Sequence, residues 1–321
     1  MCARPCPRRI LSFRLPAGLS GVTVSGWPTA AGPAIECTGR DGPGECAIQA
    51  WRKSNLELPS ESLPLRRANP LRLAWIAIGT TACTLVQSCL VMVARGDGAK
   101  VRRRVDSIAR TWSKQLLDLV EASVEVHGDF AASVEPGKPV IVMCNHSSLY
   151  DIPISFLSIP GSLRMLTKKE LFQIPLFSGA MRRGEFVSID RKDREQAIKD
   201  LELARLKMED GIILWVAPEG TRSHDGKLGA FKGGAIRLAI QTGATIVPIA
   251  IKNSHEIQSG KHVAAVLGQQ VQVEIGSPID ATNYSIRERG KLSAAVRNSM
   301  LAMLGQTTGD STGNREGEVA G

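Results

Sequence analysis

Short apolar runs alternate with stretches of helical periodicity between residues 137 and 304 of this 321-residue chain. A strand that is buried on both faces is a short apolar run, whereas a helix packed on a sheet has apolar residues three and four apart. The alternation therefore predicts an α/β fold, a mixed sheet flanked by helices. We expect strands at 140–144, 163–167, 186–189, 212–216, 245–251 and 271–275. We expect helices at 152–158, 176–181, 194–209, 233–241 and 286–304.

An uncharged stretch at residues 73–94 precedes this domain, with Arg72 and Arg95 at its two ends. At about 1.5 Å per residue, a helix of this length matches a hydrocarbon core of about 30 Å. It predicts an N-terminal helical membrane anchor that spans the bilayer. Thr84 and Gln87 lower its hydrophobicity, so an interfacial or re-entrant helix and a buried core helix stay as alternatives.

The chain divides into four parts by composition and period. Residues 1–65 are rich in Gly, Pro, Ser and Arg and predict a disordered leader, since their prolines interrupt any amphipathic targeting helix. Residues 66–125 form a membrane-associated helical segment, which ends with an amphipathic helix at 105–123. Residues 126–304 form the α/β domain, and the polar, glycine-rich residues 305–321 predict a disordered tail.

The net charge of +9 is unevenly distributed. Residues 1–100 carry 12 basic and 6 acidic side chains, whereas the remaining 221 residues carry 28 basic and 25 acidic ones. A nucleic-acid-binding protein would concentrate this excess on its folded body, so the charge argues against a nucleic-acid partner and for an anionic membrane surface. The seven cysteines include no CxxC pair, which favours a reducing compartment and gives no support to a zinc site.

The first expected strand ends in Asn145-His146-Ser147-Ser148-Leu149-Tyr150-Asp151. If the strand stops at Cys144 and a helix starts after Asp151, the turn between them can fold the carboxylate back onto the imidazole. Such a pair fixes the tautomer of the histidine and leaves its other nitrogen as a general base. The alternative is that Asp151 only caps the helix and that His146 is an ordinary surface residue.

A second polar segment, Pro218-Glu219-Gly220-Thr221-Arg222, follows the strand expected at 212–216. Its glycine permits a close approach of the backbone, and the guanidinium of Arg222 offers a planar set of donors suited to phosphate. It could also be an ordinary turn with an ion pair. In α/β sheets, however, loops at the carboxyl ends of strands converge on one crevice.

Together these segments resemble the NHxxxxD and EGTR motifs of the glycerolipid acyltransferase family. Four further segments resemble its motifs in the same order, over roughly residues 105–280: Lys168 to Pro175, Ile189-Asp190-Arg191, Phe231 to Ala235, and Val247-Pro248-Ile249. Gly184 lies one residue further from Ile189-Asp190-Arg191 than the matching glycine does in many members, which leaves its role open.

The resemblance implies roles for individual residues. His146 would be the general base and Asp151 its orienting partner. Glu219, Gly220, Thr221 and Arg222 would line the acceptor site, with Arg222 on phosphate. Arg191 and one of Lys168 and Lys169 would add positive charge. No metal and no bound cofactor is implied. The tetrahedral oxyanion still needs donors, and backbone amides at 146–148 or around Gly220 are the candidates.

The resulting expectation is an acyltransferase in phospholipid biosynthesis. It would move a fatty acyl group from acyl-CoA or acyl carrier protein to the sn-2 hydroxyl of 1-acyl-sn-glycerol 3-phosphate (lysophosphatidic acid), forming phosphatidic acid. We expect membrane lipids as partners and an active site that faces the cytoplasm. Alternatives are another lysolipid acceptor, a non-catalytic lipid-binding protein of the same fold, and a thioester hydrolase with Cys144 as nucleophile.

Two groups of residues have weaker functional signals. Val247-Pro248-Ile249 either lines an acyl channel or packs in the core. The remaining histidines lack an acidic partner at a telling spacing, so we interpret them as surface or packing residues: His127, His224, His255 and His262.

Overall fold

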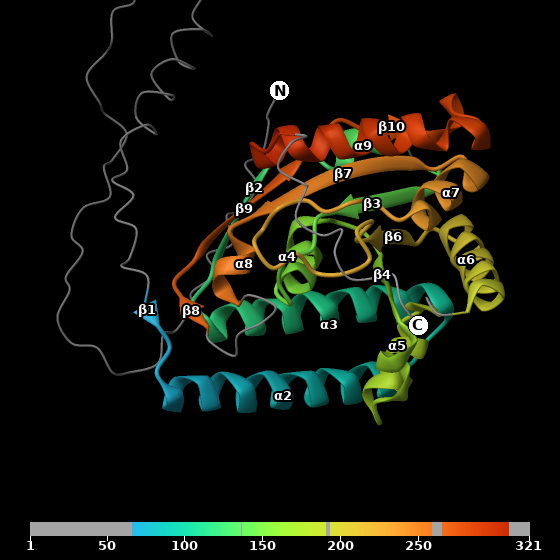
Figure 1. Ribbon diagram of the computed structural model, residues 1–321. Helices are drawn as coiled ribbons and strands as arrows, with labels where there is room; N and C mark the ends of the chain where they lie inside the picture. The colour runs from blue at the N-terminus through green and yellow to red at the C-terminus, as the bar shows by residue number, and fades with distance from the viewer. Residues whose placement is uncertain (1–65, 136, 191–192, 259–264, 308–321) are drawn as a thin grey trace, which may run out of the picture. The chain divides into compact units, whose positions relative to one another are not determined.

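A mixed β-sheet forms the centre of the computed structural model, which describes residues 66–307 except 136, 191–192 and 259–264 (Figure 1). Its eight strands run in the order β2, β9, β7, β3, β6, β4, β5, with β10 beside β7. Their bounds are β2 Ser123–His127, β3 Val140–Cys144, β4 Leu163–Lys168, β5 Val187–Ile189, β6 Ile213–Val216, β7 Thr245–Lys252, β9 Gln270–Ile275 and β10 Ile279–Asp280. β7 is antiparallel to β9 and β10, while the other pairs are parallel, which confirms the expected α/β fold with a mixed sheet.

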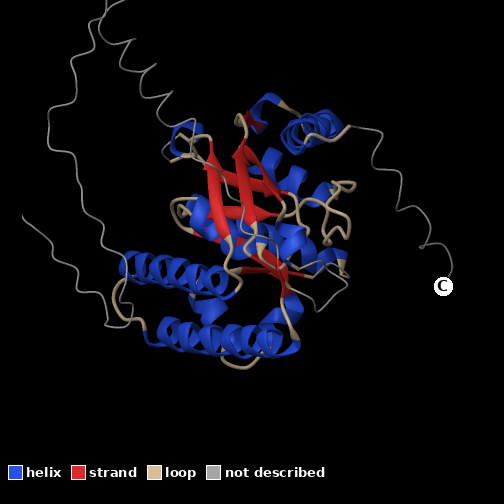
Figure 2. Ribbon diagram, turned by 90° about the vertical axis from the view of Figure 1, so that its left-hand side faces the viewer, coloured by secondary structure: helices blue, strands red, loops and turns tan. Residues whose placement is uncertain are grey.

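Helices cover both faces of the sheet (Figures 1 and 2). The α-helices are α2 Pro70–Val93, α3 Gly98–Leu119, α4 Asp151–Ser158, α5 Phe177–Arg183, α6 Arg194–Glu209, α7 Gly233–Thr242, α8 Ser254–Ile257 and α9 Arg289–Leu304. Short 3-10 turns are η1 Ala131–Ser133, η2 Lys169–Gln173, η3 Ala281–Asn283 and η4 Ile286–Glu288, and a two-stranded ladder joins β1 Arg66–Arg67 to β8 Val266–Leu267.

The side chains of β3 divide the core into two clusters. Val142 and Cys144 pack toward α3 and α4, whereas Ile141 and Met143 pack toward α6, α7 and α9. All five residues of β3 are buried, so neither face of this central strand reaches solvent. The continuous apolar run at 140–144 is what a strand in this position requires.

α2 has an inverted distribution of polar and apolar side chains. Gln87 and Ser88 are buried, and Gln87 donates a hydrogen bond to Gln115 of α3 over 3.0 Å. Trp75, Ile78 and other large apolar residues are exposed instead. Only 22% of the most apolar window of α2 is buried, so the core-helix alternative fails. The helix is long and apolar enough to cross a membrane.

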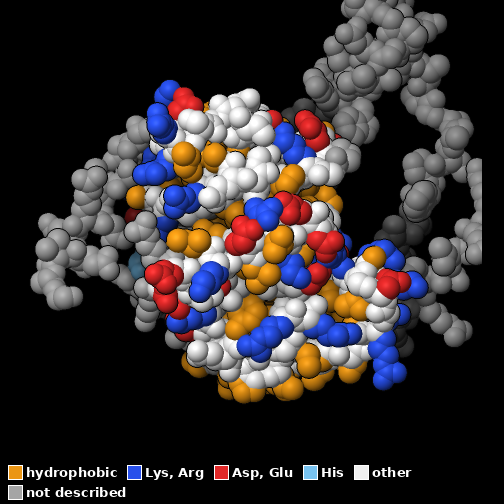
Figure 3. Space-filling view, turned by 90° about the vertical axis from the view of Figure 1, so that its right-hand side faces the viewer, with side chains coloured by type: hydrophobic (Ala, Val, Ile, Leu, Met, Phe, Trp, Pro, Cys, Tyr) orange, Lys and Arg blue, Asp and Glu red, His pale blue; other side chains and the backbone are white. Residues whose placement is uncertain are grey.

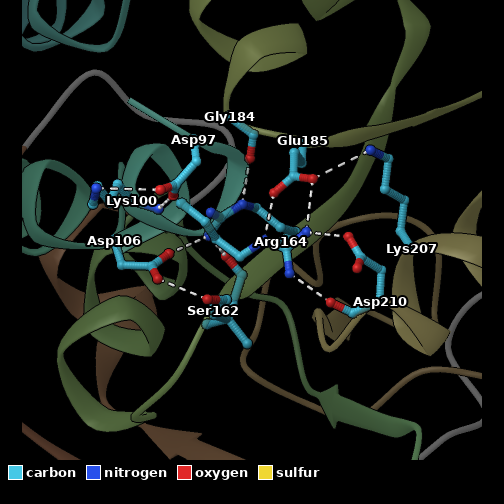
Figure 4. A network of polar contacts seen from close by, with 11 residues as sticks. Asp97, Lys100, Asp106, Ser162, Arg164, Gly184, Glu185, Lys207 and Asp210 are labelled. Atoms are coloured by element: carbon cyan, nitrogen blue, oxygen red, sulfur yellow. Dashed lines mark hydrogen bonds and ion pairs between the residues drawn. The ribbon is translucent and has the colours of Figure 1, made fainter. Parts of the chain in front are cut away.

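A charged network ties α3 to the sheet (Figure 4). Arg164 of β4 is fully buried; its Nη1 lies 2.7 Å from Asp106 of α3, and its Nε donates to the carbonyl of Gly184. Arg102 of α3 binds both carboxylate oxygens of Glu185, at 2.7 and 2.9 Å. The Arg102 guanidinium lowers the pKa of Glu185. Gly184 therefore contributes a backbone acceptor to this network.

Three predicted boundaries need correction. The amphipathic helix expected at 105–123 extends instead from Gly98 to Leu119. It cannot continue to residue 123 because Glu121 adopts a left-handed backbone with φ 57°. The next residues form β2, so the expected domain boundary between 125 and 126 falls inside a strand. Gly305 ends α9 in a left-handed conformation and the Gln306 side chain is hydrogen-bonded beside it, so residues 305 and 306 do not belong to a disordered tail. The leader expected at 1–65 and residues 308–321 lie outside the described residues.

Candidate active site

The site begins where β3 ends. The Asn145 side chain donates to the carbonyl of Ile251 over 2.9 Å and accepts from the Ile251 amide over 2.8 Å. An asparagine amide can thus replace a peptide group in the ladder to β7, since it presents one donor and one acceptor. The main chain is free to leave the sheet at His146 while the pairing with β7 continues for one more position.

His146 and Asp151 form the expected pair. Nδ1 of His146 lies 2.8 Å from Oδ2 of Asp151, at the first residue of α4. The same oxygen accepts the amides of Ser147 and Ser148 at 2.7 and 2.8 Å, and the Ser254 hydroxyl donates to Oδ1. Because a carboxylate only accepts hydrogen bonds, this geometry fits the neutral imidazole tautomer with its proton on Nδ1 and its lone pair on Nε2. The Asp151 side chain is fully buried, whereas 19% of the His146 side chain is exposed.

Glu219 holds the backbone of His146. Its Oε1 accepts the His146 amide over 3.0 Å, and its Oε2 accepts the Gly229 amide over 2.7 Å. The carbonyl of His146 accepts the amide of Ser223 over 2.7 Å, so the loop 217–232 binds both sides of this one residue. Burial raises the pKa of Glu219, and the two backbone donors oppose that rise. Glu219 therefore positions His146, and both of its oxygens are already bonded.

Gly220 and Arg222 lie in the same loop. Gly220 has φ 75°, and a Cβ atom there would lie 2.8 Å from Cδ of Lys232, so glycine serves both the backbone and the close approach. Thr221 is exposed and Arg222 is half-buried. Arg222 makes no hydrogen bond or ion pair to any described residue, which leaves its donors available. Lys232 brings a further cation against Gly220, a proximity that the sequence did not reveal.

Of the other cations expected at the acceptor site, Lys168 and Lys169 differ in whether their charge is available. Lys168 ends β4 and is exposed. Lys169 forms an ion pair with Asp190, which raises the pKa of the lysine and occupies its charge. Of the two, Lys168 is therefore the available cation. Arg191 lies outside the described residues.

The backbone amides expected to stabilise an oxyanion are already engaged. Those of His146, Ser147 and Ser148 bind Glu219 and Asp151, and that of Gly220 binds the carbonyl of Ala217 over 3.1 Å. Next to Gly220, the amides of Glu219, Thr221 and Arg222 have no acceptor among the described residues and remain as donors. Local sequence could not show this, because the acceptors belong to other segments.

Two alternative sites from the sequence lose support. Cys144 is fully buried, and burial raises the pKa of its thiol well above the ordinary value, which opposes a nucleophilic thiolate. Val247 and Ile249 lie in the core of β7, and Pro248 is buried between them, so this segment packs the sheet.

Two residues that the sequence did not single out also contact the pair. Trp215 of β6 stacks edge-to-face with His146, with ring centroids 5.8 Å apart. Ser254 joins the Asp151 carboxylate from α8, as described above. Of the remaining histidines, His127 and His224 are exposed, His255 is half-buried and His262 lies outside the described residues. No group of three or more His, Cys, Asp or Glu side chains that could hold a metal occurs in the described part of the chain.

Comparison with known proteins gives a consistent family. A family model described as Acyltransferase matches residues 123–252. The human protein named 1-acyl-sn-glycerol-3-phosphate acyltransferase alpha is 31% identical over 191 residues, which cover 59% of this chain and 66% of the human one. A coconut (Cocos nucifera) 1-acyl-sn-glycerol-3-phosphate acyltransferase is 34% identical over 145 residues, 45% of this chain and 47% of its own. The chain thus spans a little under two thirds of the human relative and about half of the coconut one.

The fold also matches a solved structure. The crystal structure of the 1-acyl-sn-glycerophosphate (LPA) acyltransferase PlsC from Thermotoga maritima superimposes with a TM-score of 0.63 and 24% identity, over 73% of this chain and 94% of that one. This likeness concerns the fold. The matched family segment contains both polar motifs and strands β2, β3, β4, β5, β6 and β7. The chain therefore belongs to the acyltransferase family, with residues 123–252 as its matched domain.

Proposed function

We propose that the protein transfers a fatty acyl group from an acyl thioester to the sn-2 hydroxyl of 1-acyl-sn-glycerol 3-phosphate, forming phosphatidic acid in phospholipid biosynthesis. The observation that carries this proposal is the His146–Asp151 pair held against the loop that bears Arg222. The names of the curated relatives support the same acceptor. Acyl-CoA and acyl carrier protein both present the required thioester.

In the proposed reaction, Nε2 of His146 removes the proton of the acceptor hydroxyl as its oxygen attacks the thioester carbonyl. The resulting imidazolium is stabilised by Asp151, whose carboxylate lies on Nδ1. The tetrahedral intermediate then expels the thiolate, the C–S bond breaks, and the imidazolium returns the proton to sulfur. The chain supplies both proton transfers, so no protein nucleophile is needed.

Acceptor recognition rests on available positive charge. Arg222 is unpaired within the described residues, and its guanidinium can bind a phosphate through two parallel hydrogen bonds. Lys232, whose side chain lies over Gly220, and Lys168 are the other cations that we assign to the acceptor. Because Lys169 is paired with Asp190, we assign it to the structure of the loop after β4.

We further propose that α2 lies in a membrane and that the active site faces the cytoplasm. In Figure 3 hydrophobic side chains gather along the lower edge, where α2 lies, with Lys and Arg side chains close above them. α3 packs along α2, and its exposed Arg103 and Arg104 would be costly in hydrocarbon. We therefore favour insertion of α2 into one leaflet, with α3 at the headgroup level.

A non-catalytic lipid-binding role is the competing proposal. Four donors converge on Asp151, and both oxygens of Glu219 hold backbone amides, an arrangement that orients one imidazole. Lipid binding alone has no use for an oriented general base, so the geometry favours catalysis.

A product profile tests the proposed function. Membranes that contain the protein receive one labelled acyl-CoA and a panel of lysolipids with and without a phosphate monoester, and His146→Ala membranes with equal amounts of folded protein serve as the control. We expect labelled phosphatidic acid from lysophosphatidic acid in the wild type alone. Labelling of a different lysolipid would change the acceptor, and wild-type labelling no higher than in the control would overturn acyl transfer.

A further inference from the structure

The long loop 217–232 connects β6 to α7. Residues 226–228 of this loop are hydrogen-bonded to the end of α9. Gln306 accepts the amide of Leu228 through Oε1 over 2.9 Å and donates from Nε2 to the carbonyl of Gly226 over 3.0 Å. Arg297 of α9 donates to the carbonyl of Leu228 over 3.2 Å. One side-chain amide thus binds the loop backbone as a strand neighbour would.

The position of Gln306 is itself fixed by the helix end. Gly305 has φ 67°, its amide binds the carbonyl of Ala302, and the amide of Gln306 binds the carbonyl of Leu301 over 2.9 Å. This pair of bonds is a Schellman motif. The motif favours glycine at its C′ position because the residue there adopts a left-handed backbone conformation. The Gln306 side chain therefore starts from a defined backbone and is half-buried against the loop.

A short chain of contacts leads from Gln306 to the site. Leu228 is 1% exposed, and the next residue, Gly229, donates its amide to Glu219 over 2.7 Å. Glu219 accepts the His146 amide through its other oxygen, and the Ser223 amide binds the His146 carbonyl. Arg222 lies between these two anchored positions. A shift of residues 226–228 would therefore move Glu219 and Ser223, which hold the backbone of His146, and would move Arg222 with them.

We propose that Gln306 is a positioning residue for the acyltransferase site, acting through loop 217–232 on Glu219 and Arg222. The proposal rests on the proposed function for its kinetic consequence, while its structural part is independent of that function. Gln306 lies outside the matched family segment 123–252, and it is joined to that segment by side-chain bonds. The end of α9 thereby becomes part of what orients the catalytic loop.

Gln306→Met tests the proposal because it removes both hydrogen bonds at nearly unchanged side-chain length. Asn298→Ala is the matched control, since Asn298 is an exposed amide residue of α9 with no hydrogen bond to the described residues. Hydrogen exchange of the 217–232 segment and steady-state kinetics are measured on full-length protein in phosphatidylcholine vesicles. We expect faster exchange in 217–232 and a kcat/KM for lysophosphatidic acid lower by about 10- to 100-fold in Gln306→Met only.

Comparing the KM for lysophosphatidic acid with the KM for acyl-CoA separates a positioning role of Gln306 from a general loss of stability. Partial unfolding reduces the amount of active enzyme and leaves KM unchanged, whereas a displaced Arg222 raises the KM for lysophosphatidic acid more than the KM for acyl-CoA. Unchanged exchange, or an unchanged KM for the acceptor, overturns the proposal. If wild type acylates no lysolipid, the proposed function fails, and the exchange data alone then decide whether Gln306 holds the loop.

Discussion

The polar groups around His146 and those around Arg164 are both buried, but they differ in what they leave unbonded. Around His146, both oxygens of Asp151 and of Glu219 are bonded, and the free atoms are the acceptor Nε2 at a partly exposed ring and the buried indole Nε1 of Trp215. Around Arg164, the free atom is a donor, Nη2, which is buried without a partner. The arrangement around His146 leaves the Nε2 acceptor on a ring that is partly open to solvent. The arrangement around Arg164 encloses its unbonded donor completely.

Under the proposed mechanism, this difference separates a network that orients a general base from one that attaches a helix to the sheet. The Arg164 network joins α3 to β4 and to the segment before β5. An unpartnered buried donor costs free energy, and the other bonds of the network fix the position of α3 against β4. Within the His146–Asp151 pair no buried polar atom lacks a partner, although the neighbouring Trp215 Nε1 does, and the bonds to Asp151 and Glu219 hold the ring and its backbone in place.

The largest expected effect follows from Asp151→Asn. The amide keeps the shape of the carboxyl but not its charge, so it no longer stabilises the imidazolium in the transition state. We expect kcat to fall by about 10²- to 10⁴-fold with an unchanged melting temperature. Wild-type kcat in this variant would remove Asp151 from the mechanism.

Arg164→Met should separate the two networks. It leaves Asp106 with an uncompensated, mostly buried charge, and we expect unfolding free energy to fall by about 3–5 kcal/mol in detergent. Adding Asp106→Asn should recover part of that loss. The double variant should retain the wild-type KM, and an acceptor KM that rises in it would mean that the Arg164 network also shapes the site.

Arg222→Ala tests the unpaired cation beside the pair. Loss of a charge-assisted hydrogen bond of about 1.5–3 kcal/mol should raise the KM for lysophosphatidic acid by about 10- to 100-fold, with a smaller change in kcat. The KM for acyl-CoA serves as the internal control. A KM for the acceptor that stays constant would argue for an acceptor without phosphate.

Ser254→Ala should have a smaller effect, because it removes one of the four hydrogen bonds to Asp151. We expect kcat to fall by about fivefold, which corresponds to one hydrogen bond of about 1 kcal/mol. A loss as large as that of Asp151→Asn would show that Ser254 takes part in the reaction rather than in orientation.

The smallest effect is expected at Cys144. Burial raises the pKa of its thiol, so it stays protonated at pH 8, and Cys144→Ala should leave kcat nearly unchanged. Iodoacetamide should spare Cys144 in the folded protein and modify it after unfolding, as mass spectrometry can show. Inactivation that tracks labelling of Cys144 would revive the hydrolase alternative.

The sequence predicted the sheet well where strands are continuous apolar runs. The strands expected at 140–144 and 245–251 match β3 and β7 within one residue. β2 was missed because its residues are mostly exposed and follow directly on an amphipathic helix, whose period masks the start of a strand. Exposure at the sheet edge removes the apolar signal on which the prediction depends.

The candidate site divides in a similar way. His146, Asp151, Glu219 and Arg222 lie within two short segments, so local patterns brought them together before the fold was known. Ser254 and Gln306 reach the site through contacts between distant segments. Serine and glutamine are common polar residues, and only the topology of β7 and α9 shows what they bind. The pairing of Lys169 with Asp190 was equally invisible.

The inverted polarity of α2 has a consequence for how the protein would meet its substrates. With α2 in one leaflet as proposed, the enzyme and a lysolipid share a two-dimensional phase. The turnover rate would then follow the mole fraction of acceptor in that surface rather than its concentration in bulk water. Diluting the bilayer with inert phospholipid would slow acylation at constant total acceptor, and the product would be released into the layer where other lipid enzymes act.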